Sequence, residues 1–331
     1  MSEGGGEGGG GESGTSQAYF DAKYGTNLQH HDIDRNHKLT KNDKQLLEKY
    51  APFLNLNCKK FEKRAIYFLR REAENRNKQL TIGLSGGVDS AVIAALCKKT
   101  GIDTKPVIVY DNKYSIEKDI KDAKKICEHI GLEHKLIDAS ELYHKNFEKI
   151  TINPHTMMGF RRALIYNFAE QENRMVVSAG NKTELYFGIM NPNSLLGDVL
   201  PIINLYKTQV LQLADHLKLP KEIVKKPSHS GIKDESKDKT LFGSLEVSDI
   251  MAYLLFENNL KYHMARFMYI PQRGRYYEDF KKIIKTHKKN IKQNITNFSF
   301  PELKYQTKKL SLLEKLKIIK LNISYFWKGL I

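Results

Sequence analysis

The sequence predicts an α/β fold, built as a doubly wound, Rossmann-like parallel sheet flanked by helices. Two observations carry this prediction. Between residues 79 and 180, short apolar runs rich in β-branched residues alternate with segments of helical apolar spacing. The first of these runs ends in a glycine-rich turn that opens a helix. Strands that alternate with helices form parallel sheets with right-handed crossovers.

The predicted elements follow in a regular order. A strand at 79–85 leads to a helix at 91–101, which a glycine ends. Next come a strand at 106–111, a helix at 115–131, a strand at 134–140, a helix at 160–172 and a strand at 175–180. The second helix has one apolar stripe, made of Ile116, Ile120, Ala123, Ile126, Cys127 and Ile130. Ligands of such sheets bind beyond the carboxyl ends of the strands, where the loops at Ser85 and Gly180 lie.

The two ends of the chain differ in composition from this middle part. Residues 1–16 are nearly all Gly, Glu and Ser, which bury too little apolar area to become ordered. We therefore expect a flexible tail there. We divide the chain into an N-terminal part at 1–45, an α/β domain at 46–262 and a basic, helical C-terminal extension at 263–331.

The positive charge is concentrated in the C-terminal extension. The chain carries a formal charge of +16, and residues 281–331 hold 13 lysines against Glu302 and Glu314. Clustered lysines bind RNA, an anionic membrane surface or a polyanionic substrate, or they form a solvated face. From Leu310 the apolar residues follow a broad helical stripe with lysines mostly opposite. This pattern fits a helix packed on the core or on a partner, and it also fits a helix lying on a membrane surface.

Cysteine usage and hydropathy indicate a cytoplasmic protein. Cys58, Cys97 and Cys127 lie far apart and form no CxxC pair, so neither a disulfide framework nor a zinc ribbon is expected. The chain has no run of 18 apolar residues and no secretory signal pattern at its start.

An EF-hand-like spacing of oxygen ligands precedes the α/β domain. Six residues stand at the loop positions that bind Ca²⁺: Asp32, Asp34, Asn36, Lys38 (through its backbone carbonyl), Thr40 and Asp43. His37 replaces the usual glycine, and the last ligand is Asp rather than Glu. A polar turn that caps a helix starting near Asn42 explains the same residues without calcium.

The turn after the first strand carries the strongest chemical signal. It reads Ser85-Gly86-Gly87-Val88-Asp89-Ser90 between a strand and a helix. Glycines let backbone N–H groups approach a phosphate closely, and the helix N-terminus adds positive potential. Asp89 is suited to Mg²⁺, and the hydroxyls of Ser85 and Ser90 are suited to phosphate oxygens. The sequence therefore predicts a site for the phosphates of a nucleotide.

With this loop the chain resembles the ATP-pyrophosphatase (PP-loop) superfamily, and within it ammonia-dependent NAD synthetase. The resemblance runs from about Thr81 to Tyr253. Further family motifs are 178–185 (SAGNKTEL), 197–201 (GDVLP), 205–210 (LYKTQV) and 219–228 (LPKEIVKKPS).

The resemblance implies an ATP-dependent ligase that forms C–N bonds and releases AMP and pyrophosphate. It implies catalytic roles for Asp89, Glu184 and Lys207, with the two carboxylates on Mg²⁺ and the lysine on the phosphates. Ser228 would contact the ATP phosphates. The acyl-substrate side would include Arg161, Asn181, Lys182 and Asp198. It further implies a homodimer, supplied with free ammonia or with ammonia from a separate amidotransferase.

The acyl-substrate side departs from the family pattern. A family loop resembling FTKYGDG is shortened between Gly188 and Asp198, and a paired RxR has become Gly159-Phe-Arg161. Deamido-NAD is the first substrate that the resemblance implies. The departures leave three alternatives open: a paralogue that activates another acid, a tRNA-modifying PP-loop enzyme, and a non-catalytic nucleotide-binding scaffold.

Overall fold

The computed structural model of the chain describes Glu48, residues 51–142, 154–187 and 197–226, and Asp249, Ile250 and Tyr253. For residues 154–155 and 185–187 it describes the backbone alone. The EF-hand-like loop at 32–43, the tail at 1–16, Ser228 and the C-terminal extension lie outside the described residues.

The centre of the fold is a sheet of four parallel strands in the order β3-β2-β1-β4. The strands are β1 (Gln79–Gly83), β2 (Thr104–Tyr110), β3 (Lys135–Asp138) and β4 (Arg174–Val176). The chain moves outward from β1 to β3 and then returns to place β4 on the other side of β1. The strand order therefore reverses beside β1, and ligands of open parallel sheets bind at such a point.

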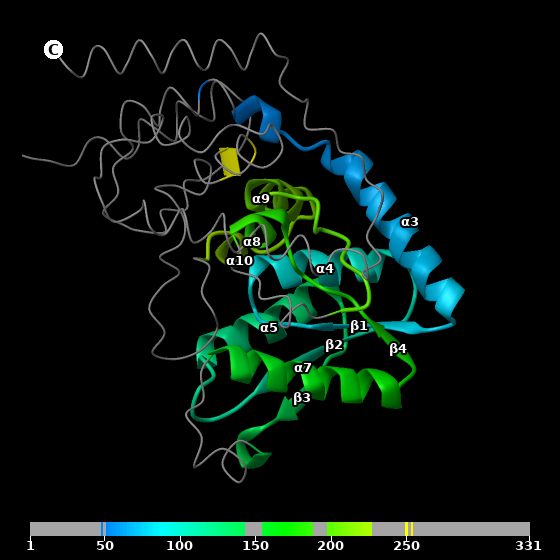
Figure 1. Ribbon diagram of the computed structural model, residues 1–331, viewed down its shortest axis with the longest axis vertical. Helices are drawn as coiled ribbons and strands as arrows, with labels where there is room; N and C mark the ends of the chain where they lie inside the picture. The colour runs from blue at the N-terminus through cyan, green and yellow to red at the C-terminus, as the bar shows by residue number, and fades with distance from the viewer. Residues whose placement is uncertain are drawn as a thin grey trace, which may run out of the picture.

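Helices cover both faces of this sheet, which confirms the doubly wound prediction (Figure 1). On one face lie α4 (Val88–Lys99) and α5 (Glu117–Ile130), with α3 (Cys58–Arg76) and α9 (Lys207–His216) packed on α4. On the other face lies α7 (Pro154–Gln171). Side chains alternate along each strand, so Ile108 and Met175 join the core under α4, whereas Val107 and Val176 contact the α7 side.

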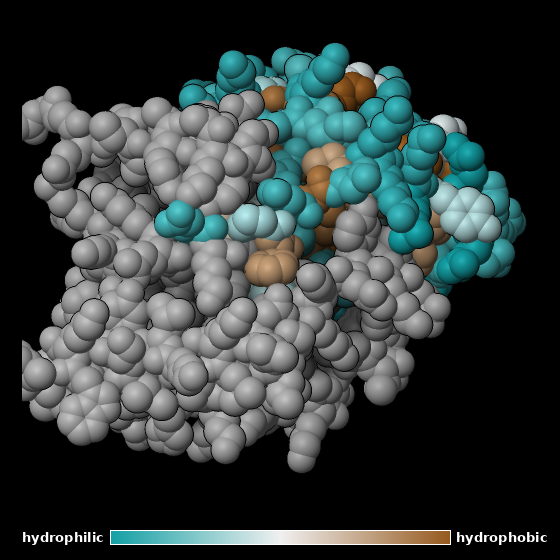
Figure 2. All heavy atoms as spheres, turned by 90° about the horizontal axis from the view of Figure 1, so that it is seen from above, coloured by the Kyte–Doolittle hydropathy of each residue, from teal (hydrophilic) through white to brown (hydrophobic). Residues whose placement is uncertain are grey.

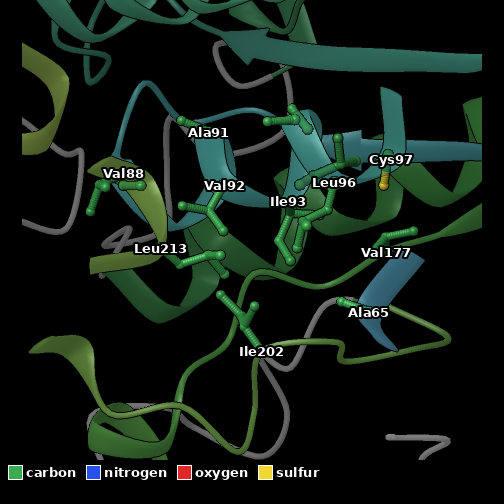
Figure 3. Packing of buried hydrophobic residues seen from close by; sticks show 14 of the residues in the cluster. Ala65, Val88, Ala91, Val92, Ile93, Leu96, Cys97, Val177, Ile202 and Leu213 are labelled. Atoms are coloured by element: carbon green, nitrogen blue, oxygen red, sulfur yellow. The ribbon is translucent and has the colours of Figure 1, made fainter. Parts of the chain in front are cut away.

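The helix after the glycine-rich turn, α4, is enclosed almost completely. Every residue from Val88 to Cys97 except Asp89 is buried. Figure 3 shows its apolar side chains among residues of α3, α9 and the segment before α9, such as Ala65, Leu213 and Ile202. Each fully buried Val, Leu or Ile contributes about 1.5–3 kcal/mol through the hydrophobic effect. The position of α4, and with it the preceding turn, is therefore fixed by the core.

The remaining described elements are short. They are the 3-10 helix η1 (Ala51–Leu54), α8 (Lys182–Phe187) and α10 (Lys221–Val224). An isolated parallel bridge between Val177 and Val199 follows β4, and it pairs β4's continuation with the chain after α8.

Some element boundaries differ from those predicted. The α4 helix begins at Val88 rather than at residue 91, because the second half of the glycine-rich turn is already its first turn. The α7 helix begins at Pro154 rather than at residue 160, and proline is favoured in the first turn because its missing N–H has no intrahelical partner there. Strand β4 ends at Val176, earlier than predicted, and only the bridge at Val177 continues it.

The described surface is mainly hydrophilic. On the face seen in Figure 2, apolar side chains appear as small separate patches. The large exposed apolar side chains are Tyr67, Leu136, Leu142 and Met158. None of the described helices is both long enough and apolar enough to cross a membrane.

Candidate functional site

The glycine-rich turn folds on itself through its two serines. The Ser90 side chain is buried, and its hydroxyl donates to the Gly87 carbonyl (2.9 Å) and accepts from the Ser85 N–H (3.3 Å). The Ser85 hydroxyl lies 3.2 Å from that of Ser90 and accepts from the Gly87 N–H at 3.4 Å. Ser90 therefore organises the turn from inside, whereas Ser85 is exposed at its outer side.

Gly86 permits the close approach of this turn to α5. Its φ is +78°, and a Cβ at this position would lie 2.3 Å from the carbonyl oxygen of Asp119. A side chain is therefore excluded both by the backbone conformation and by space. Gly87 then caps α4 with extended backbone, so the first N–H groups of α4 point into the turn. Such N–H groups and the helix dipole favour an anion.

Asp89, in the first turn of α4, is the charged centre of the site. Its Oδ1 accepts a hydrogen bond from the Asn181 side-chain amide at 3.0 Å. Its Oδ2 forms an ion pair with the ammonium of Lys207. The loops after β1 and β4 therefore meet at Asp89, as expected for two strands that flank the reversal of strand order.

Asn181 and Glu184 form a reciprocal cap at the start of α8. The Asn181 Oδ1 accepts from the Glu184 N–H (3.0 Å), and the Glu184 Oε2 accepts from the Asn181 N–H (3.3 Å). This is a capping box with asparagine in the N-cap position. The Asn181 side chain is fully buried and bonds Glu184 through its oxygen and Asp89 through its nitrogen. Asn181 thus contacts both carboxylates: its side-chain amide donates to that of Asp89, and its backbone N–H donates to that of Glu184.

Lys207 is a buried lysine at the first position of α9, with 7% of its surface exposed. A cation at a helix N-terminus opposes the helix dipole, so the helix itself does not favour this residue. Burial would lower the pKa of Lys207, but the negative charges of Asp89, Glu184 and Asp249 raise it overall. The ammonium therefore stays charged, and it lies beside Asp89 of the glycine-rich turn.

Asp249 and Thr183 belong to the same network, although the sequence alone predicted no role for either side chain. The Asp249 side chain is fully buried and accepts from the Thr183 hydroxyl (2.6 Å) and from the Thr208 N–H (2.8 Å). Thr183 in turn accepts from the Lys207 N–H at 2.8 Å. Thr183 and Asp249 are separated by 66 residues, so only the tertiary structure brings them together.

The four residues predicted for the acyl-substrate side fall in different places. Asn181 lies beside Asp89 of the glycine-rich turn. The Lys182 ammonium lies 4.9 Å from the centre of the Tyr206 ring. Asp198 accepts from the Val176 N–H at 2.8 Å, at the end of β4. Arg161 lies across the sheet, on α7.

Arg161 contacts the carboxyl end of β2. It donates to the Ser115 hydroxyl at 2.9 Å and lies 3.6 Å from a carboxylate oxygen of the buried Asp111. Asp111 itself accepts from the N–H groups of Lys113 and Tyr114 and from Ser115. Arg161 is thereby held at the same edge of the sheet as the glycine-rich turn, because the carboxyl ends of parallel strands share one edge.

The donor set fits a divalent magnesium ion. Asp89 and Glu184 supply two carboxylates from different elements, joined through Asn181. Mg²⁺ in proteins usually takes one or two carboxylates and completes its shell with phosphate oxygens and water. Among the described residues no group of three or more His, Cys, Asp and Glu side chains forms a metal cage. A site that relies on substrate phosphates does not need such a cage.

Comparison with known proteins identifies one family. The model of the NAD synthase family matches residues 62–300. The NH(3)-dependent NAD(+) synthetase of Wolinella succinogenes is 34% identical over 203 residues, which cover 58% of this chain and 76% of that protein.

Two solved structures are similar. The structure of NMN synthetase from Francisella tularensis superposes with a TM-score of 0.54 and 25% identity, over 78% of this chain and 98% of that one. The NH3-dependent NAD synthetase from Campylobacter jejuni superposes with a TM-score of 0.56 and 23% identity, over 71% of this chain and 96% of that one. At this identity the second match speaks for the fold alone.

Proposed function

This chain belongs to the NAD synthase family, and we propose that it joins the carboxylate of deamido-NAD to ammonia at the expense of ATP. The products are NAD, AMP and pyrophosphate. One observation carries the proposal. A glycine turn at the reversal of strand order lies beside Asp89 and Lys207, and Asn181 joins Asp89 to Glu184.

In the first step a carboxylate oxygen of the acid attacks the α-phosphorus of ATP. The bond from this phosphorus to the β-phosphate oxygen breaks, and the leaving pyrophosphate takes its electrons. The N–H groups at the start of α4 and the ammonium of Lys207 would hold the departing charge. Preorganised donors of this kind act most strongly in a site that excludes water.

In the second step ammonia attacks the acyl carbon of the mixed anhydride. The bond from that carbon to the AMP oxygen breaks, the amide forms, and one proton leaves the nitrogen. The chain needs no covalent nucleophile for this sequence, since it holds two substrates in position and balances their charge. The buried thiol of Cys97, whose pKa burial raises, takes no part in it.

Asp89 and Glu184 are the residues that would hold Mg²⁺, which would neutralise the charge on the phosphates. Asn181 orients the Asp89 carboxylate through its side-chain amide and the Glu184 carboxylate through its backbone N–H. Lys207 forms an ion pair with Asp89, so its charge is already present where phosphate oxygens would come.

A mass-spectrometric assay tests the proposal directly. The protein is supplied with ATP, Mg²⁺, deamido-NAD and ¹⁵N-ammonium, and NAD, AMP and pyrophosphate are measured. We expect the label in the amide of NAD and equal amounts of AMP. A parallel reaction with the mononucleotide acid that corresponds to NMN tests a shorter substrate.

Matched variants identify the site. Asp89→Ala should abolish AMP formation, whereas Glu74→Ala, on the exposed face of α3, should leave it unchanged. If the wild-type protein converts ATP to AMP with another acid but not with deamido-NAD, the substrate assignment is wrong. Wild-type rates in Asp89→Ala would exclude the site.

Three further features complete the proposal. The nitrogen source is free ammonia or a separate amidotransferase, and the protein works in the cytoplasm as a homodimer. Light scattering of the purified chain measures the dimer.

Three features remain predictions of the sequence: the EF-hand-like loop, the contribution of Ser228 and the partner of the basic extension at 263–331. Calcium titration tests the loop, and truncation at residue 262 tests the extension.

A further inference from the structure

Lys226 connects the glycine-rich turn at residues 85–90 with helix α5. It follows α10, and its side chain is 9% exposed. Its ammonium donates to the Gly86 carbonyl at 3.2 Å and to Asp122 of α5 at 2.5 Å. It also forms an ion pair with Asp119 of α5 at 2.7 Å. Gly86 lies 140 residues earlier in the chain, so this contact is set by tertiary structure.

Lys226 compensates the negative charges of Asp119 and Asp122. The side chains of Asp119 and Asp122 are only 10% and 14% exposed, and both contact the ammonium that donates to the Gly86 carbonyl of the turn. With Lys226 the three groups carry a net charge of minus one, and without it they carry minus two. A buried charge that loses its partner is strongly unfavourable, and in this place it would also repel a polyphosphate.

Lys226 contacts the turn at Gly86, whose conformation is tightly constrained. Gly86 has its positive φ and no room for a Cβ against the Asp119 backbone, so small movements of α5 or of the turn would change its conformation. Lys226 bonds the Gly86 carbonyl and both α5 carboxylates at once. It therefore holds the turn and α5 in a single spacing.

We propose that Lys226 is a positioning residue for the pyrophosphate part of ATP, acting through Gly86. It keeps the turn in the conformation that presents its N–H groups, and it cancels negative charge behind them. The proposal rests on the proposed function only in that the turn binds the outer phosphates of ATP. It gives Lys226 a role for ATP and pyrophosphate affinity and none for AMP affinity.

The test is calorimetric binding of Mg-ATP, Mg-pyrophosphate and AMP to wild-type protein, Lys226→Met and Lys225→Met. Lys225 is the exposed neighbour of Lys226, and it serves as the matched control. We expect Lys226→Met to weaken ATP and pyrophosphate by about tenfold each, the size typical of one lost charge-assisted hydrogen bond. AMP affinity should stay within twofold, and Lys225→Met should match the wild type for all three ligands.

A second variant covers the case in which Lys226→Met does not fold. Lys226→Met combined with Asp122→Asn removes one of the two uncompensated charges, so this double variant should fold. Relative to wild type, it should lose more affinity for ATP and pyrophosphate than for AMP. Unchanged ATP and pyrophosphate affinity, or an equal loss for all three ligands, would overturn the proposal.

These measurements use no acyl substrate, so they separate the two proposals. Wild-type protein that binds ATP but forms no NAD refutes the proposed function while Lys226 is still judged by the binding data. Wild-type protein that binds neither ATP nor pyrophosphate refutes both.

Discussion

Asn181 offers a way to separate the stability of the site from its chemistry. Its oxygen caps α8 and its nitrogen bonds Asp89. Asn181→Ser keeps an N-cap oxygen but has no amide to reach Asp89, because serine is a good N-cap with a shorter side chain. Asn181→Ala removes both functions. Comparison of the two variants therefore assigns each effect to one end of the amide.

The magnitudes follow from the two hydrogen bonds. An N-cap contributes about 1 kcal/mol, and a hydrogen bond to a charged group about 1.5–3 kcal/mol. Asn181→Ala should therefore lower the free energy of unfolding by about 2.5–4 kcal/mol and Asn181→Ser by about 1 kcal/mol less. Both should lower kcat/KM to a similar extent, about 10- to 100-fold, because a misplaced catalytic carboxylate has this kind of effect.

Urea unfolding and steady-state rates of AMP formation measure the two quantities. We expect two variants that differ in stability but match in activity. If Asn181→Ser works at the wild-type rate, the amide does not orient Asp89. If the two variants are equally stable, the capping box contributes nothing to the fold.

Further substitutions test the phosphate turn, the pH response and the buried network. Gly86→Ala should destabilise the fold by clearly more than Gly101→Ala, since both have a positive φ but only Gly86 lacks room for a Cβ; Gly101→Ala should cost about 1–2 kcal/mol in urea unfolding. Burial would raise the pKa of Glu62, but hydrogen bonds from Lys99 and His216 lower it overall. The ionised Glu62 therefore stabilises the fold above the pKa that its carboxyl has in the unfolded chain, and this stabilisation is lost as the pH falls through its lower pKa in the folded protein. Glu62→Gln should thus flatten the dependence of the unfolding free energy on pH in this acidic range. Asp249→Asn should reduce both unfolding free energy and AMP formation, because the neutral amide cannot balance the buried lysine; unaltered values would exclude Asp249 from the site.

Much of the fold was predictable because it depends on local patterns. Alternating strands and helices predicted the parallel sheet, and the glycine turn between a strand and a helix indicated the edge of the sheet at which the candidate site lies. The spacing of Asn181 and Glu184 is that of the N-cap and N3 positions of a helix, so a capping box at α8 is consistent with the sequence alone. Side-chain periodicity could not give the strand order, because it carries no information on which strands are neighbours.

The rest of the site depends on contacts that are distant in sequence. Asp249 lies beyond the last family motif, which ends at residue 228, and no pattern near it in the sequence predicts its hydrogen bond with Thr183. Lys226 stands in a lysine-rich stretch, where a single buried lysine cannot be distinguished from its exposed neighbours by composition. Arg161 was predicted for substrate recognition, and its contact with Ser115 could be seen only once α7 was placed against β2.

The enclosure of α4 has a consequence for how this protein can change over generations. Almost every substitution along that helix would disturb neighbours on several sides, so we expect α4 and the glycine-rich turn before it to tolerate little variation. Residues such as Arg161, Lys182 and Asp198 are attached to separate elements, and one can be exchanged while the others stay. A saturation library of the gene should therefore lose viable members around α4 and retain them at these outer positions, which is where a lineage would acquire a new acid to amidate.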